Sequence, residues 1–271
     1  RIRDEAVIEM KPILLVDFGS TNTKVTAVDV ENYEVLGTAA AYTTVETDIN
    51  NGFREAVSNL EKITGHIEYV ERYACSSAAG GLKMISIGLV PELTAQASRE
   101  ASLGAGAKVW KTYSFNLTKG DMREIEEYHP DIILLTGGTD GGNSECILYN
   151  AQMLSSLSYD CPIVIAGNRC AAEECQEILG ERTTFLCENV MPKLGELNIE
   201  PTQKQIREIF LKRIVQGKGL SEAADLVSGI IMPTPSAMLT AMELLSDGWE
   251  ELRGIGELVG VDLGGATTDI Y

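Results

Sequence analysis

Two short segments at opposite ends of the sequence share a pattern of residues that could bind an anion. Residues 16–25 read VDFGSTNTKV and residues 261–270 read VDLGGATTDI, so the two segments align without a gap. Each places an aspartate, Asp17 or Asp262, at the end of an apolar run and directly before a turn of small and hydroxyl residues. Such a turn exposes backbone N–H groups that bind anionic oxygens. The repeat therefore predicts two facing turns that hold one polyphosphate.

The two aspartates predict a metal ion beside the phosphates. A carboxylate repels a phosphate, so Asp17 and Asp262 can act only through Mg²⁺ or through the water molecules that Mg²⁺ coordinates. The sequence has no G-x-x-x-x-G-K-[ST] motif and no G-x-G-x-x-G motif that opens a helix. Either turn taken singly fits an ordinary β-hairpin equally well, and only the pairing of the two favours ATP and Mg²⁺ as ligands.

Composition excludes several classes of partner. The chain has 271 residues, with 22 Lys and Arg against 40 Asp and Glu, and its net charge of −18 would repel nucleic acid and anionic membranes. The best candidate for a membrane span, residues 226–245, is interrupted by prolines, so no span is expected. Six cysteines without disulfide or metal-ligand spacing, and an N-terminus without a secretory signal, predict free thiols and a cytoplasmic protein. Met10 could be the native start, which leaves residues 1–9 unexplained.

Between the two turns, the apolar pattern changes from successive strands to a strict alternation of strands and helices. Residues 13–30 predict a strand, a turn and a returning strand, residues 33–44 continue the sheet, and residues 51–60 have helical spacing. The alternating part predicts strands at 84–90, 107–113, 131–135, 162–166 and 183–187, and helices at 91–103, 121–128, 142–157 and 171–179. Strands that are separated by such helices run parallel. Beyond Pro192 the sequence predicts helices at 202–214, 221–227 and 236–245 and a strand at 258–262.

Several other motifs have both a functional and a structural interpretation. Two motifs follow predicted parallel strands, at the edge where ligands of such sheets bind: the glycine-rich loop at 136–143 and the pair Gly167-Asn168. In the structural interpretation, the glycines form turns and the asparagines cap helices. We favour the structural interpretation. Cys170 and Cys175 differ by about 140° around a helix, so they cannot share a metal. His66 and His129 have no paired ligand nearby in the sequence, which is typical of surface or capping residues.

The two turns resemble the phosphate-binding hairpins of the superfamily that contains actin, sugar kinases and heat-shock chaperones. From Met10 to its end, the chain is similar to the MutL (GlmL) family, the accessory proteins of adenosylcobalamin-dependent glutamate mutase. Besides the two turns, the residues that carry this resemblance are 76–82 (SSAAGGL), 136–143 (TGGTDGGN) and 232–235 (MPTP). The resemblance implies an α/β fold in which a ribonuclease H-like (actin-like ATPase) lobe carries an inserted doubly wound parallel βα domain. The first lobe would be formed by residues 11–82 and 191–258, the insert by residues 83–190 and the start of a second lobe by residues 259–271.

The resemblance also implies a function and its residues. The protein would be an ATP-dependent reactivating factor that exchanges damaged cobalamin in a mutase of the glutamate mutase type, with no nucleic-acid or membrane partner. Asp17 and Asp262 would organise Mg²⁺ and the attacking water. The residues implied at the phosphates are those of the two turns and their flanks, Gly19, Ser20, Thr21, Asn22, Thr23, Lys24, Gly264, Gly265, Thr267 and Thr268.

Two departures from the superfamily pattern limit this expectation. Ala266 stands where many members have a third glycine, and the chain ends at Tyr271, before the expected returning strand of the second hairpin. We therefore expect a fragment with little nucleotide affinity, and steady-state ATPase activity of the 271-residue chain would contradict this. Two alternatives stay open at this point, a small-molecule kinase of the same superfamily, for which no general base can be identified, and a non-catalytic module that docks a partner. An activator of a radical dehydratase would need cluster-binding cysteines, which the spacing does not provide.

Overall fold

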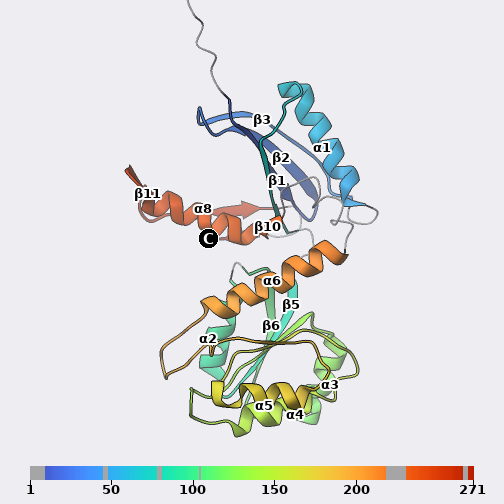
Figure 1. The fold of residues 1–271 in the computed structure, drawn as a ribbon, viewed down its shortest axis with the longest axis vertical. Helices are drawn as coiled ribbons and strands as arrows, with labels where there is room; N and C mark the ends of the chain where they lie inside the picture. Colours follow the sequence, from blue (N-terminus) through green and yellow to red (C-terminus); the bar gives the residue numbers. More distant parts are fainter. Residues whose placement is uncertain (1–9, 45–47, 78–80, 104, 218–229, 265–267) are drawn as a thin grey trace, which may run out of the picture. The chain divides into compact units, whose positions relative to one another are not determined.

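The chain folds into two compact units. A computed structural model describes residues 10–44, 48–77, 81–103, 105–217, 230–264 and 268–271 (Figure 1). Unit 1 comprises Arg1–Gly80 and Leu211–Tyr271, and unit 2 comprises Gly81–Phe210. Both units have an α/β fold that contains parallel strands, as predicted. Within the described ranges, no helix combines the length and the apolar character that crossing a membrane requires.

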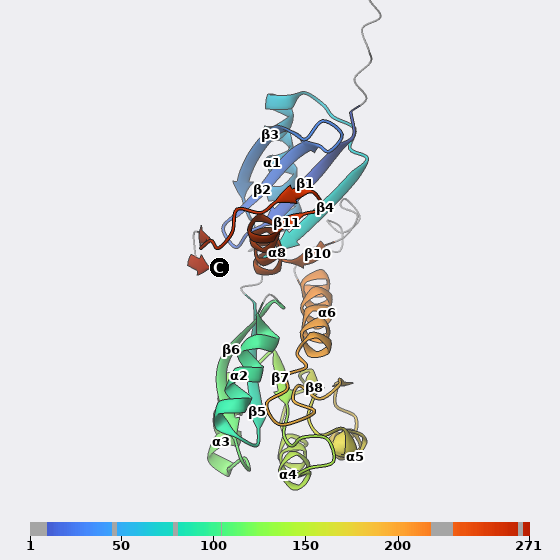
Figure 2. The same ribbon diagram turned by 90° about the vertical axis from the view of Figure 1, so that its left-hand side faces the viewer.

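Unit 1 is built on a mixed five-stranded sheet. The strands are β1 (Pro12–Phe18), β2 (Asn22–Asp29), β3 (Glu34–Tyr42), β4 (Glu71–Ser76) and β10 (Ile230–Pro233), in the order β10-β4-β1-β2-β3. The first three pair in antiparallel fashion, whereas β4 and β10 run parallel to their neighbours. The helix α1 (Ile49–Thr64) packs on β2 and β3 (Figure 2), and its Phe53 ring lies 5.7 Å from that of Phe18. This packing fixes β1, the strand that delivers Asp17.

The C-terminal part of unit 1 contains a helix and two small hairpins. The helix α8 (Thr234–Asp247) follows β10 directly, β11 (Gly248–Trp249) pairs with β12 (Leu252–Arg253), and β13 (Val261–Leu263) pairs with β14 (Thr268–Ile270). The presence of β14 corrects the expectation that the chain ends before the returning strand, because three residues suffice to pair back on β13. The helix expected at 221–227 lies outside the described residues.

Unit 2 contains the predicted parallel sheet. Its strands are β5 (Leu82–Gly88), β6 (Ala107–Ser114), β7 (Ile132–Leu135), β8 (Ile163–Ile165) and β9 (Thr184–Leu186), in the order β6-β5-β7-β8-β9, and all neighbours are parallel. The helices between them are α2 (Pro91–Ser102), α3 (Lys119–Tyr128), α4 (Glu145–Leu154) and α5 (Arg169–Leu179). The central strands β7 and β8 are buried over their whole length, which explains their continuous apolar runs.

The boundary between the units lies further along the chain than expected. We expected residues 191–258 to belong to the first lobe. Residues 191–210, which include the first part of the helix α6 (Glu200–Gly217), belong to unit 2 instead. The reason is apolar contact, because Ile206 and Phe210 on α6 are buried, and Phe210 packs on the backbone of Gly106. A Cβ atom at Gly106 would lie 2.5 Å from the Phe210 ring, so the ring fits only against a glycine. The insert therefore ends at 210 rather than 190.

Candidate functional site

Three elements hold the carboxylate of Asp17. Asp17 pairs in register with Lys24 on β2 and with Cys75 on β4. The hydroxyl of Thr234, the first residue of α8, donates a hydrogen bond to Asp17 Oδ1 at 2.8 Å, and the Cys75 thiol lies 3.5 Å from the same atom. Lys24 Nζ lies 3.9 Å from Asp17 Oδ2. The aspartate at the end of β1 is therefore fixed in place by its neighbours rather than free to rotate.

The turn between β1 and β2 is closed by a backbone hydrogen bond. The N–H of Gly19 donates to the carbonyl oxygen of Asn22 at 3.1 Å, so this N–H closes the hairpin. A Cβ atom at Gly19 would lie 2.6 Å from the same oxygen, which explains the glycine. Ser20 and Thr21 then form the tip of the turn. Gly19 therefore shapes the turn, and the binding of phosphate by Gly19, Ser20 and Thr21 stays a prediction.

The structure also corrects the assignment of Thr23. Its side chain is fully buried, and its hydroxyl pairs with that of Thr43 at 3.0 Å. Successive side chains of a strand point to opposite faces, so Thr23 faces the core while Asn22 and Lys24 face outward. The Thr23 side chain therefore supports the hairpin from the core.

The second segment forms a hairpin of the same register as the first. The cross-strand pairs of the first hairpin are Val16–Val25, Asp17–Lys24 and Phe18–Thr23, and those of the second are Val261–Ile270, Asp262–Asp269 and Leu263–Thr268. Thr268 is exposed at the start of β14, while Gly265 and Thr267 lie outside the described residues. The sequence repeat is therefore also a repeat of backbone geometry. The two hairpins differ in one charge, because Asp269 lies opposite Asp262 whereas Lys24 lies opposite Asp17.

Both hairpins line one cavity of about 150 Å³ in unit 1. The lining residues are Asp17, Gly19, Ser20, Thr21, Asn22, Lys24, Ser77, Thr234, Pro235, Asp262, Leu263, Gly264, Asp269 and Tyr271. The structure thus brings together Asp17 and Asp262, which are far apart in the sequence. Thr23 and Thr268 do not belong to this lining.

The cavity carries an excess of negative charge. Three carboxylates, of Asp17, Asp262 and Asp269, face one ammonium group, that of Lys24, so the charges of these lining residues sum to 1 − 3 = −2. Asp262 and Asp269 oppose each other directly across the hairpin, and like charges in such a pair repel each other. Burial, followed by the nearby Asp269 and Asp262 carboxylates, raises the pKa of Tyr271 to about 12, so this phenol stays protonated at neutral pH. The site is suited to a cation.

The donor set fits Mg²⁺ in combination with phosphate. Mg²⁺ prefers oxygen ligands and is usually bound by one or two carboxylates together with water and substrate phosphates. In the part of the chain that the structure describes, no group of three His, Cys, Asp or Glu side chains could hold a metal by itself. A cation in this cavity would therefore take further ligands from phosphate and water.

Two residues of the site were missed by the sequence reasoning. Asp269 stands at the position of Lys24 in the aligned repeat, and the reversal of charge at that position was the signal that could have identified it. Thr234 belongs to the MPTP segment, and only the fold brings it to Asp17. The other sequence candidates have structural roles, since His66 pairs with Glu61 and His129 ends α3.

The cysteines provide a direct test of the burial around Asp17. All six are free. Burial, together with the Asp17 carboxylate, raises the pKa of the Cys75 thiol to about 12, whereas Cys170 is exposed on α5. Since only the thiolate reacts, and a thiol of that pKa is about one part in ten thousand ionised near pH 8, iodoacetamide should modify Cys170 long before Cys75. Peptide mass spectrometry checks the order, and equal rates in the folded chain would contradict it, with the denatured chain as the control.

A family model and a related protein point to the same family. The family model described as "MutL protein" matches residues 13–271. "Protein MutL" from Clostridium tetanomorphum is 52% identical over 266 residues, which cover 97% of this chain and 58% of that protein. The chain thus spans less than two thirds of its relative's length.

Two solved structures show only a weak likeness. One is the nucleotide-free form of acetone carboxylase, with 9% identity, a TM-score of 0.35, and coverage of 86% of this chain and 35% of that chain. The other is the ethanolamine utilization protein EutJ from Carboxydothermus hydrogenoformans, with 12% identity, a TM-score of 0.21, and coverage of 75% of this chain and 91% of that chain. Neither likeness carries an argument about the site.

Proposed function

Because this chain belongs to the MutL protein family, we propose that it is part of an ATP-dependent accessory factor for an adenosylcobalamin-dependent mutase of the glutamate mutase type. Hydrolysis of ATP by the longer protein would drive a change of conformation in which the mutase releases damaged cobalamin and accepts an intact molecule. The ligands would be ATP and Mg²⁺, and the partner would be the mutase.

The observation that carries this proposal is that two hairpins of equal register line one cavity. The backbone and hydroxyl groups of Ser20, Thr21 and Gly264 would contact the phosphates from two sides. Asp17 and Asp262 would hold Mg²⁺ directly or through water, and they would orient a water molecule toward the terminal phosphate. Bound Mg²⁺ would supply the positive charge that lets the nucleotide enter a cavity lined by three carboxylates.

The arrangement of unit 1 supports the assignment to an actin-like lobe. An antiparallel run of β1, β2 and β3 continues into parallel strands β4 and β10, and unit 2 is inserted between them in the sequence. The site lies where β1 ends, next to the first turn of α8. A shift of α8 would therefore move Asp17, which gives a route from the nucleotide to the rest of the protein.

Thr234 offers a test of this route. Thr234→Val removes the hydrogen bond to Asp17 Oδ1 without changing the shape of the side chain. A hydrogen bond to a charged group contributes about 1.5–3 kcal/mol, so we expect ATP hydrolysis by the longer protein to fall roughly tenfold or more. Thr234→Ser keeps the hydroxyl and should retain activity. Equal activity of the valine and serine variants would contradict the positioning role.

The proposed function is tested with a longer protein that extends this chain to the full length of its relatives. ATP hydrolysis should require Mg²⁺ and should increase when a mutase carrying damaged cobalamin is added, and intact cobalamin should then replace the damaged molecule. Absence of Mg-ATP binding would contradict the proposal and favour a docking module. Transfer of phosphate to a small molecule instead of water would favour a kinase.

A further inference from the structure

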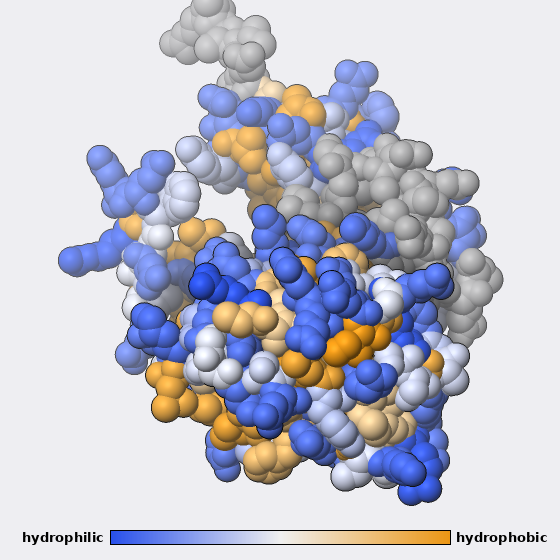
Figure 3. All heavy atoms as spheres, turned by 60° about the horizontal axis from the view of Figure 1, so that its bottom comes forward, coloured by the Kyte–Doolittle hydropathy of each residue, from blue (hydrophilic) through white to orange (hydrophobic). Residues whose placement is uncertain are grey.

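Unit 2 contains a cavity that the proposed function does not use. In the sheet, β6 lies next to β5 on one side, and β7, β8 and β9 follow in turn on the other side of β5. The strand order therefore reverses between β5 and β7. The loops that follow these two strands leave in opposite directions, and ligands of such sheets bind in the resulting crevice at the carboxyl ends of the strands. On the face of the molecule that Figure 3 shows, apolar residues form patches between hydrophilic ones.

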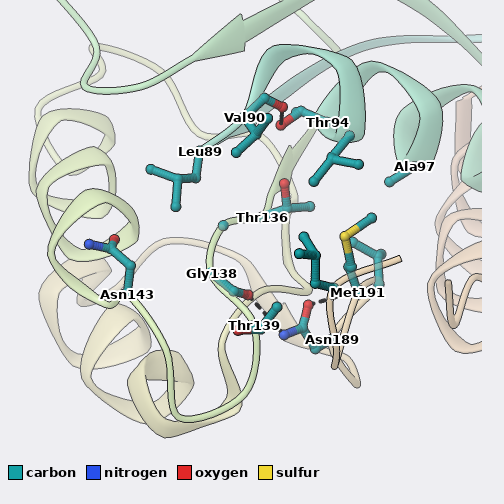
Figure 4. A pocket seen from close by; sticks show the side chains of 14 residues that line it. Leu89, Val90, Thr94, Ala97, Thr136, Gly138, Thr139, Asn143, Asn189 and Met191 are labelled. Atoms are coloured by element: carbon teal, nitrogen blue, oxygen red, sulfur yellow. Dashed lines mark hydrogen bonds between the residues drawn. The ribbon is translucent and has the colours of Figure 1, made fainter. Parts of the chain in front are cut away.

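The crevice holds a cavity of about 280 Å³, near the lower end of the size of ligand pockets. It is lined by Leu89, Val90, Leu93, Thr94, Ala97, Thr136, Gly137, Gly138, Thr139, Asn143, Asn189, Val190, Met191 and Leu194. In Figure 4, Leu89, Val90 and Thr94 border the open space on one side, and Gly138, Asn189 and Met191 border it on the other. None of these described lining residues is charged, and half of them have apolar side chains. An anionic ligand such as a nucleotide would find no counter-charge here.

The glycine-rich loop that forms one wall is held in a fixed conformation. Gly137 and Gly138 have φ values of +135° and +74°, which favour glycine. The buried Asn189 donates to the Gly138 carbonyl at 3.0 Å and accepts from the Met191 N–H at 3.0 Å. The buried Asn168 caps α5 and also accepts from the Gly141 N–H at 3.1 Å. The asparagine cap expected from the sequence is present, and the same side chain preforms the wall of the cavity.

Two threonine hydroxyls lie together beside the backbone of Gly88, at the end of β5. Thr94 donates to the Val90 carbonyl at 2.6 Å, and Thr136 donates to the Ile87 carbonyl at 3.0 Å. Each hydroxyl has thereby used its hydrogen, but its oxygen can still accept a hydrogen bond. These two hydroxyl oxygens therefore offer hydrogen-bond acceptors to a ligand that donates.

We propose that this cavity binds an uncharged, mostly apolar ring compound that carries an N–H or O–H donor. The apolar walls would cover the faces of the ring, and the threonine oxygens would accept its hydrogen bond. Because the glycine-rich loop is already held in place, binding would cost little conformational entropy of the protein. This site lies wholly within unit 2 and does not depend on the nucleotide site.

Indole is a suitable probe, with N-methylindole lacking the donor and indole-3-acetate carrying a negative charge. In the 271-residue chain with ¹³C-labelled methyl groups, indole should shift the signals of Leu89, Val90 and Met191 in a saturable manner. N-methylindole and indole-3-acetate should each bind at least about tenfold more weakly, which corresponds to about 1.4 kcal/mol. Equal binding of all three probes would overturn the proposal, as would the absence of saturable shifts.

Variants locate the binding. Leu93→Trp on α2 fills the cavity, and the matched control Leu103→Trp places the same ring at an exposed position beyond the end of α2. The first should weaken indole binding at least tenfold, and the second should not change it. Leu194→Glu adds a charge at the rim, at a residue that is 79% exposed and tolerant of substitution, and should also weaken binding. Binding that survives both Leu93→Trp and Leu194→Glu would refute this location.

Discussion

Replacing Asp262 with asparagine is expected to remove nearly all ATP hydrolysis by the longer protein. The change keeps the size of the side chain but removes a charge from the cavity shared by the two hairpins. Loss of even an outer partner of a metal typically costs about 10–100-fold in affinity or activity, so we expect a loss of at least about a hundredfold. Asp17→Asn should have an effect of the same size, because Asp17 occupies the corresponding position of the other hairpin. Initial rates at varied Mg²⁺ concentration provide the measurement.

A matched control separates this effect from a general loss of negative charge. Asp247→Asn removes an exposed carboxylate at the end of α8, in the same unit but outside the cavity. Its activity should equal that of the unmodified protein. If Asp262→Asn is as active as Asp247→Asn, the two hairpins do not bind one nucleotide.

Replacing Phe210 with alanine is expected to destabilise unit 2 more than any surface change. The ring is 1% exposed and packs on the backbone of Gly106, so its removal leaves a cavity beside Gly106. Replacement of a buried phenylalanine by alanine typically costs about 3–5 kcal/mol. Hydrogen exchange of the amides in β5 and β7 reports the free energy of unfolding of unit 2 directly.

Two comparisons make the Phe210 result specific. Phe115→Ala, at a residue that is 60% exposed in the same unit, should change the free energy of unfolding by less than about 0.5 kcal/mol. Amides in β1 and β2 of unit 1 should keep their protection in the Phe210 variant. Equal destabilisation by both substitutions would show that residues 200–210 do not complete the core of unit 2.

The sequence predicted unit 2 well because its central strands are buried on both faces. The runs at Ile132–Leu135 and Ile163–Ile165 are wholly apolar, and the helices between them have clear end signals, such as Thr118 before α3. The strand β4 (Glu71–Ser76) was missed because it begins with the charged residues Glu71 and Arg72, so its sequence lacks an apolar run. The end of the insert was placed too early because the partner of Phe210 is a glycine, which carries no side chain and gives no apolar signal.

The repeat predicted two hairpins, which the structure contains, but not how each residue in them packs. Alignment alone could not show that the Gly19 N–H closes the turn or that Thr23 faces the core, because both depend on how the strands pair. Thr234 reaches Asp17 from a distant part of the sequence, and no local pattern predicts such a contact. The predicted roles of Asp17 and Asp262 remain proposals, which the cavity around them supports.

The most direct test of the shared nucleotide site uses Mn²⁺ in place of Mg²⁺ with the longer protein. Paramagnetic broadening by Mn²⁺ acts over a limited distance, so it shows which amides surround the metal. In the presence of ATP, we expect the amide signals of Ser20, Thr21 and Gly264 to broaden together, and to recover when excess Mg²⁺ is added. Broadening of only one hairpin, or of neither, would contradict the account.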